Sequence, residues 1–116
     1  MTNDKEMCKD FEDNGAIYPK VSPDHIERLL SQVKYDVQLV ADTTTTIVTG
    51  YITMGNVDFT LATATMACVD KRNFNKELGA KYCTEKCKAM CKDKLWELEG
   101  YLLAQKVANG EVTHYD

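Results

Sequence analysis

The stretch YDVQLVADTTTTIVTGYIT, residues 35–53, decides the fold class of this chain. It is rich in β-branched and aromatic residues, which suit a pleated strand better than a helix. Tyr35, Val37 and Leu39 alternate with polar neighbours, which indicates a first strand. The second half of the stretch places apolar residues on both faces of a second strand, so we expect both of these faces to meet protein. The four threonines at 43–46 are accordingly predicted to belong to a strand rather than to a catalytic cluster.

The segments on either side of this stretch extend the prediction to an α+β chain. Met54-Gly55-Asn56 has the composition of a turn, and DFTLATATM (58–66) is expected to pair back as the next strand of a small antiparallel sheet. Upstream, Ser22-Pro23-Asp24 combines a helix cap, a proline suited to the first helical position and an acid in the first turn. We expect this N-terminal helix to end near residues 33–34. Its predicted buried stripe consists of Ile26, Leu29, Leu30 and Val33.

A long C-terminal helix is predicted to follow the sheet. Asn73 is the expected cap, Phe74 the first helical residue and Lys106 approximately the last, before Asn109-Gly110 ends the helix. Such a helix is about 48 Å long. Its predicted apolar surface recurs every seven residues, at Tyr82, Ala89, Trp96 and Leu103, with leucines beside it.

This apolar surface is larger than one small sheet can cover, so self-association through the long helix is expected. Gly79 and Gly100 interrupt the helix, and each costs about 1 kcal/mol relative to alanine. We expect close approach of another backbone or of a ligand to compensate for both. The fold class predicted is therefore α+β and homo-oligomeric.

Composition limits the classes of function that need to be considered. A length of 116 residues with 44% hydrophobic residues fits one domain, which we place at 22–116. The acidic stretch 1–21 is predicted to be a flexible arm with a short helix around Met7 to Phe11. The net charge of −4 argues against a general DNA binder. Without a long apolar run or a recognisable export signal, and with five cysteines, we expect no membrane association and a reducing cytoplasm.

The segment CTEKCKAMCK (83–92) raises the question of a metal site, because Cys83, Cys87 and Cys91 lie four residues apart. On a helix these thiols span about 12 Å, whereas zinc–sulfur bonds are near 2.3 Å. An adjacent pair fits one ion, but the further ligands of a tetrahedral site must then come from elsewhere. Small buried side chains that permit close packing explain the spacing better. We therefore expect no metal.

Signatures of catalysis are also missing. The sequence has no phosphate-cradling glycine loop, and Ser22 and Ser31 lack the context of a nucleophile. Glu97 and Glu99 lie two residues apart on a helix and so point to different faces. We expect a binding protein that is not an enzyme and that uses no cofactor.

One constellation suits the binding of a nucleotide-sized anion. The segment between sheet and long helix brings cations, an aromatic ring and amides next to a helix N-terminus, which favours anions. The predicted ligand-binding residues are Lys71, Arg72, Asn73, Phe74, Asn75 and Lys81. The alternative is structural: Phe74 anchors the helix start in the core, Asn73 only caps it, and the basic side chains are solvated.

Three segments carry a resemblance to a known family. DTTTT (42–46), the pattern ACVD…NFN.E.G.K from Ala67 to Lys81, and KLWELEGYLL (94–103) resemble small phage-borne proteins that include the type-one Thoeris anti-defence proteins. The resemblance covers roughly residues 23–104, and the tryptophan-centred segment is its most specific part. It implies a compact α+β homo-oligomer, a dimer or a hexamer.

The resemblance also implies a function. Such proteins are sponges: they sequester cyclic ADP-ribose isomers made by bacterial TIR-domain enzymes, without degrading them, in the cytoplasm of the bacterial host. Some also hold cyclic oligonucleotides in separate sites. Phe74 is the position carried over for base stacking, and Lys86 and Lys88 depart from the expected pattern. A second site is predicted from polar groups near both chain ends, namely His25, Arg28, Thr113 and His114.

Two alternatives from other classes stay open. A structural or regulatory phage protein would bind a protein partner through the long helix. A hydrolase of the same cyclic nucleotides would release product rather than intact ligand.

Overall fold

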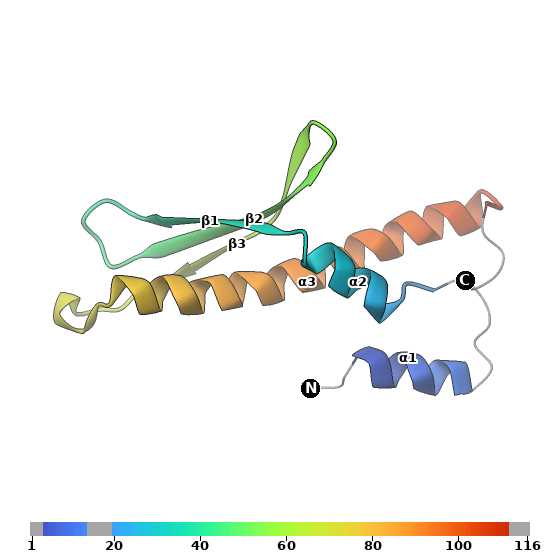
Figure 1. Cartoon of the computed structure of the whole chain (residues 1–116), viewed down its shortest axis with the longest axis horizontal. Coiled ribbons are helices and arrows are strands. Elements are labelled where there is room, and N and C mark those ends of the chain that lie inside the picture. The colour runs from blue at the N-terminus through green and yellow to red at the C-terminus, as the bar shows by residue number, and fades with distance from the viewer. Residues whose placement is uncertain (1–3, 14–19, 112–116) are drawn as a thin grey trace. The chain divides into compact units, whose positions relative to one another are not determined.

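The computed structural model describes residues 4–13 and 20–111 and shows an α+β chain (Figure 1). Its elements in chain order are α1 (Asp4–Asp13), α2 (Pro23–Leu30), β1 (Lys34–Leu39), β2 (Thr46–Met54), β3 (Val57–Met66), the 3-10 helix η1 (Lys71–Asn73) and α3 (Lys76–Ala108). The predicted fold class, a small antiparallel sheet with an N-terminal helix and one long C-terminal helix, is confirmed. The chain separates into two compact units, residues 30–94 and the described residues on either side of them, and α3 contributes to both.

The three strands form an antiparallel meander in the order β1-β2-β3. The predicted turn between β2 and β3 is confirmed, with Gly55 at φ 61°, a left-handed conformation that glycine adopts at little cost. One irregularity interrupts the β2–β3 pairing. Gly50 pairs with Ala62 and Tyr51 with Thr60, so that Leu61 is an extra residue in β3.

The threonine run at 43–46 is the part of the sheet prediction that was wrong. Only Thr46 belongs to a strand, and the three residues before it form the turn between β1 and β2. The Thr43 hydroxyl donates to the carbonyl oxygen of Val40 (2.6 Å) and accepts from the backbone N–H of Thr45 (3.1 Å). Threonine hydroxyls that bond to nearby backbone in this way favour turns over strands.

One face of the sheet is covered by residues 76–94 of α3 (Figure 1). The cysteines at 83, 87 and 91 lie on this helix face and are fully buried. The Cys83 thiol donates to the sheet, 3.4 Å from the carbonyl oxygen of Ala64, and the Cys87 thiol lies 3.6 Å from that of Ala62. The cysteine stripe is therefore a small, buried packing surface, as the sequence predicted, and it packs against a sheet.

The surface that was predicted from the seven-residue repeat is distinct from this stripe and is partly exposed. Tyr82 is 49% exposed and Ala89 is also exposed, whereas Trp96 and Leu103 are half-buried. The buried face is set by small residues that fit the sheet rather than by the largest apolar side chains. The apolar surface of α3 that stays exposed consists of Leu78, Tyr82, Met90, Tyr101, Leu102 and Val107.

The opposite face of the sheet is less covered than expected. Val48 and Ile52 are buried under α3, but Ile47 and Tyr51 on the other face are only half-buried. The expectation that both faces of the second strand meet protein is therefore met in full by the face under α3 and only in part by the opposite face.

At the edge of β3, the Lys86 ammonium donates to the carbonyl oxygen of Thr65 (3.0 Å), which occupies an acceptor of an unpaired strand edge.

The helix boundaries test the capping predictions. The Ser22 hydroxyl accepts from the backbone N–H of His25 (3.1 Å), which confirms the cap of α2. This helix ends at Leu30, earlier than predicted, because the chain turns there and enters β1 at Lys34. At the far end of α3, Gly110 adopts φ 72° and confirms the predicted stop.

The start of α3 differs from the prediction by two residues. Asp70 caps η1, and its carboxylate accepts from the backbone N–H of Arg72 (2.9 Å). Phe74 then adopts an extended conformation, and Asn75 accepts from the N–H of Leu78 (3.1 Å) to cap α3. The predicted cap at Asn73 and the predicted start at Phe74 are therefore wrong, because a separate 3-10 turn precedes the long helix.

The other unit contains α1, most of α2 and residues 95–108 of α3. The expected short helix around Met7 to Phe11 is present within α1. The Trp96 indole N–H donates to the Asp4 carboxylate (3.2 Å), so α1 bonds to α3 here. The predicted division into a flexible arm at 1–21 and one domain at 22–116 stays a prediction. In the described ranges, no helix has the length and apolar character that a membrane span requires.

Candidate functional site

A pocket of about 290 Å³ opens where β2 begins, β3 ends and α3 starts. We call it the Phe74 pocket. The β1–β2 turn and β2 contribute Thr44 and Thr46, and the end of β3 contributes Met66, Ala67 and Cys68. The segment entering α3 and its first two turns supply Asn73, Phe74, Asn75, Leu78, Gly79 and Tyr82.

Gly79 is the position where the absence of a side chain keeps this pocket open. A Cβ at position 79 would lie 3.2 Å from the Thr46 hydroxyl oxygen and 3.7 Å from a ring carbon of Phe74. The close approach at this glycine is made by the side chains of Thr46 and Phe74, whereas approach of a backbone or of a ligand was expected. Gly100 is different, since a Cβ there would meet no atom of the described chain within 4 Å. The compensating contact expected at Gly100 is therefore not made by the residues that the structure describes.

The predicted ligand-binding residues divide into two groups. Asn73, Phe74 and Asn75 line the Phe74 pocket, as the binding interpretation requires. Lys71, Arg72 and Lys81 are exposed and do not line it. Asn75 has a structural task as well, because its amide oxygen caps α3.

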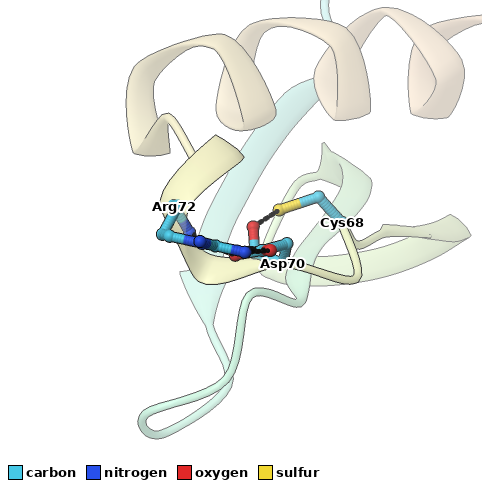
Figure 2. A network of polar contacts seen from close by, with 3 residues as sticks. All are labelled: Cys68, Asp70 and Arg72. Atoms are coloured by element: carbon cyan, nitrogen blue, oxygen red, sulfur yellow. Dashed lines mark hydrogen bonds and ion pairs between the residues drawn. The ribbon is translucent and has the colours of Figure 1, made fainter.

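The Arg72 guanidinium is already paired with a carboxylate (Figure 2). Its Nη2 lies 2.6 Å from Asp70 Oδ2, and its Nε lies 3.1 Å from Oδ1. These hydrogen bonds hold the pKa of Asp70 below its usual range and raise the pKa of Arg72. Because the pair is solvent-exposed, its main effect is to cancel a positive charge that the sequence had assigned to an incoming anion.

Lys81 meets an aromatic ring rather than a pocket wall. Its ammonium nitrogen lies 5.3 Å from the ring centroid of Tyr82, within the range of a cation–π contact. Tyr82 itself lines the Phe74 pocket. Lys81 therefore places a positive charge next to the ring of a lining residue without lining the pocket itself.

The segment between β3 and α3 is bonded to the β1–β2 turn and is braced by a bond within itself. The Thr44 hydroxyl donates to the carbonyl oxygen of Cys68. The Cys68 thiol in turn donates to the carbonyl oxygen of Asp70 (3.4 Å), the bond drawn in Figure 2. These bonds fix the path of the chain that presents Phe74.

Sequence reasoning missed more than half of the pocket wall. Thr44 and Thr46 were assigned only to a strand, Leu78 was assigned only to the apolar surface of the long helix, and Cys68 was considered only as a further ligand of a metal site that the spacing disfavours. Gly79 carried a usable signal, since a glycine inside a long helix indicates close approach of another group. The contributions of the β1–β2 turn had no local signal, because they depend on which loops meet at this end of the sheet.

The predicted second site is only partly within the described residues. Arg28 Nη2 donates to His25 Nδ1 (3.2 Å), so these two residues are brought together. The other ring nitrogen, His25 Nε2, bonds to the Glu99 carboxylate, a partner that the sequence had not indicated. With Nδ1 accepting, Nε2 carries the proton and donates to Glu99. Thr113 and His114 lie outside the described residues.

Buried thiols and carboxylates do not gather into a tetrahedral metal site. Over the part of the chain that the structure describes, no group of three or more His, Cys, Asp or Glu side chains could hold a metal ion. Cys8 and Cys68 are half-buried and lie outside the fully buried stripe on α3.

Comparison with known proteins places the chain in a family. The family model described as Phage protein (N4 Gp49/phage Sf6 gene 66) matches residues 21–107, and this range includes the sheet, the Phe74 pocket and nearly all of α3. No curated protein and no solved structure matches the chain. From the extent of the family match, the chain belongs to the phage protein (N4 Gp49/phage Sf6 gene 66) family.

Proposed function

We propose that this phage protein is an anti-defence sponge that binds cyclic ADP-ribose-type immune signals and thereby blocks Thoeris-type immunity in the bacterial cytoplasm. The observation that carries the proposal is the Phe74 pocket. It combines the aromatic rings of Phe74 and Tyr82 with the amides of Asn73 and Asn75. Family membership supports a phage origin, and the sequence resemblance supplies the class of ligand.

The pocket chemistry suits the uncharged end of a nucleotide. Aromatic faces stack on a planar base, and amide and hydroxyl groups bond to its edge. A volume of about 290 Å³ lies at the small end of the range for ligand pockets, about 300–1,000 Å³. We therefore propose that the pocket takes one base, while the phosphates remain outside it near Lys71, whose side chain is exposed.

We further propose that the protein acts by binding and not by turnover. The described lining of the pocket contains no carboxylate and no imidazole, the groups most often used for acid–base hydrolysis. Sequestration requires tight binding, and a dissociation constant near 1 nM corresponds to about −12 kcal/mol. A pocket this small covers part of the ligand, so we propose that a second copy, in a dimer or hexamer, covers the rest.

The test is recovery of intact ligand. Purified protein is mixed with enzymatically produced cyclic ADP-ribose isomer, free ligand is removed by filtration, and the protein is denatured by heat. Intact signal in the final filtrate supports the sponge, and Phe74→Ala should abolish its retention. Phe59→Ala is the matched control, because Phe59 lies on β3, is 42% exposed and does not line the pocket.

Two results would contradict the proposal. Signal destroyed before heating would identify a hydrolase. Signal that is never retained, at protein concentrations well above that of the ligand, would remove the nucleotide-binding function altogether.

A second site for cyclic oligonucleotides is proposed at His25 and Arg28. The Glu99 carboxylate bonds to His25 and limits the positive charge of this site. Arg28 is therefore the residue that would contribute most of the attraction for an anion. Arg28→Ala should weaken binding of a cyclic oligonucleotide and leave retention of the cyclic ADP-ribose isomer unchanged. Equal binding of the oligonucleotide by Arg28→Ala and the unmodified protein would refute this assignment.

The second candidate function is a structural or regulatory protein that binds a protein partner through α3. The observation that favours it is the exposure of large apolar side chains near the end of this helix, with Tyr101 at 64%, Leu102 at 48% and Val107 at 49%. Self-association would use the same surface. Sedimentation should therefore show an oligomer that Leu102→Glu disrupts, and a monomer of the unmodified chain at micromolar concentration would contradict self-association.

A further inference from the structure

A buried hydroxyl group lines the Phe74 pocket and has no role so far. Thr46 is the first residue of β2, is 3% exposed and is the one buried residue among the described residues that line the pocket. Its Oγ1 faces the space beside Gly79, since a Cβ at that glycine would lie 3.2 Å from this oxygen. Thr46 therefore lies deepest in the pocket, whereas Asn73 and Asn75 are exposed.

The Thr46 hydroxyl has no hydrogen-bond partner among the residues that the structure describes. Thr46 bonds through its backbone instead, and its carbonyl oxygen accepts from the Cys83 thiol (3.6 Å). A buried hydroxyl normally has a partner, because burial without one costs free energy. Valine suits a central strand at least as well as threonine does. A bond to a group that enters the pocket would explain why this position carries a hydroxyl.

The neighbouring polar groups of the pocket have fixed roles as donor or acceptor. The Thr44 hydroxyl donates its proton to the carbonyl oxygen of Cys68, so it can only accept from a ligand. The Asn75 amide oxygen accepts from the N–H of Leu78 (3.1 Å), which leaves the amide nitrogen as a donor. The Thr46 hydroxyl can do both. Because no charged side chain belongs to the described lining, the pocket complements a neutral edge that carries a donor and an acceptor together.

We propose that the Thr46 hydroxyl determines which base the Phe74 pocket takes, by bonding to an edge on which an exocyclic amino group lies beside an unprotonated ring nitrogen, as in adenine. This assignment rests on the proposed function of the pocket and adds its specificity. The amino group donates and the ring nitrogen accepts, so the edge matches the acceptor of Thr44 and the donor of Asn75. A base without the amino group leaves buried polar groups of the pocket without partners, which weakens its binding. Cytosine has the same edge on a smaller ring.

Replacement of Thr46 by valine separates this role from a structural one. Thr46→Val exchanges the hydroxyl for a methyl group and keeps the branched shape that suits a strand. Since the hydroxyl has no partner within the described chain, its removal breaks no side-chain bond of the folded protein. Thr46→Val should therefore unfold at the same temperature as the unmodified protein or at a higher one. A hydroxyl that stabilised the fold through a hydrogen bond would give the opposite result, a lower thermal midpoint.

The experiment is an NMR titration of the full-length protein with adenosine, followed at the backbone N–H of Gly79. We expect saturable binding, and purine riboside, which lacks the amino group, should bind about tenfold more weakly. In Thr46→Val the affinity for adenosine should fall about tenfold and the preference over purine riboside should be lost. Thr46→Ser restores a hydroxyl and should keep both. Thr63→Val is the matched control, because Thr63 is an exposed threonine of β3 that does not line the pocket.

Several outcomes would overturn the assignment. These are equal affinity of Thr46→Val and the unmodified protein for adenosine, a lower thermal midpoint of Thr46→Val, binding of purine riboside or cytidine at least as tight as that of adenosine, and no saturable binding of adenosine at all.

The sponge and the role of Thr46 can fail separately. Retention of intact cyclic ADP-ribose isomer together with any of these outcomes would leave the sponge in place and remove only the role of Thr46. Adenosine binding that depends on Thr46, without retention of the cyclic ADP-ribose isomer, would remove the sponge and leave the base-binding pocket.

Discussion

The backbone of Gly50 on β2 lies directly against the thiol of Cys91 on α3, so that a Cβ at position 50 would overlap the sulfur atom. The contact joins the helix and the sheet of one unit. It explains why a glycine occupies the middle of the central strand, where it is normally unfavourable. Both residues are small because the two backbones approach closely at this point.

Gly50→Ala should therefore destabilise the protein by about 1–3 kcal/mol, the usual cost of overpacking a core. The measurement is urea unfolding under reducing conditions. Combining Gly50→Ala with Cys91→Ala removes the overlapping sulfur, and the double variant should be more stable than the sum of the two single effects predicts. Strictly additive effects would show that the two positions do not oppose each other.

Gly100→Ala is the matched control, since a Cβ there meets nothing within 4 Å. This variant should gain about 1 kcal/mol from helix propensity. A loss of stability in Gly100→Ala would show that the backbone at this glycine is covered by another group, as self-association would require.

Gly79→Ala separates ligand binding from folding. The new methyl group would gain helix propensity but would lie 3.2 Å from the Thr46 hydroxyl oxygen and reduce the Phe74 pocket. We expect the free energy of unfolding to change by less than about 1 kcal/mol and retention of cyclic ADP-ribose isomer to fall at least about tenfold. Unchanged retention in a folded Gly79→Ala protein would place the ligand elsewhere.

Asn75, rather than Asn73, should carry the capping energy of α3. The Asn75 amide oxygen accepts from the N–H of Leu78 (3.1 Å). Asn75→Ala should therefore cost about 1 kcal/mol of stability, and Asn73→Ala, which leaves this bond in place, about 0.5 kcal/mol or less. Thermal unfolding of the two variants in parallel makes the comparison, and a larger loss in Asn73→Ala would return the cap to the position predicted from sequence.

Stability should fall at alkaline pH because buried groups keep protons that the unfolded chain releases. Burial is the largest cause that raises the pKa of Cys91, to about 12 from an ordinary value of 9.0, and it also raises the pKa of Cys83 and of Tyr35. The folded pKa of each thiol lies above its unfolded value. The contribution is therefore complete below about pH 9 and is lost as pH rises from there through the folded pKa.

The measurement is the urea midpoint between pH 8 and pH 11 in the presence of a reductant. Each such group contributes at most about 1.4 kcal/mol per pH unit to the decline. Cys91→Ala should flatten the decline, and Cys68→Ala, which removes a thiol outside the buried stripe, should leave it unchanged. A midpoint that stays constant across this range would contradict the burial of these thiols.

Local chemistry accounts for the features that the sequence predicted correctly. The Ser22 cap, the turn at Gly55 and the helix stop at Gly110 each depend on interactions within a few residues, so the residue types alone identify them. The change from helical to alternating periodicity after residue 34 likewise defines the sheet. Asn73, Phe74 and Asn75 were predicted to bind ligand from the chemistry of their side chains, and all three line the Phe74 pocket.

The features that were predicted incorrectly have two different causes. Asp70 holds a 3-10 turn that postpones the start of α3 and binds Arg72 two residues away, so a local arrangement replaced the cap predicted at Asn73 and cancelled the charge assigned to a ligand. His25 has a partner, Glu99, that lies 74 positions away in sequence, and a pattern read along one segment contains no information about that neighbour.

The sequence by itself determined that this chain is α+β, where most of its elements begin and end, and that its cysteines are packing residues. Only the tertiary structure decided which partner the buried stripe of α3 meets. The spacing of Cys83, Cys87 and Cys91 predicted a packing stripe, and the structure places this stripe against the sheet, where small side chains fit against Gly50 and Ala64. Hydrophobic burial is non-directional, whereas shape complementarity depends on the surface that the partner presents.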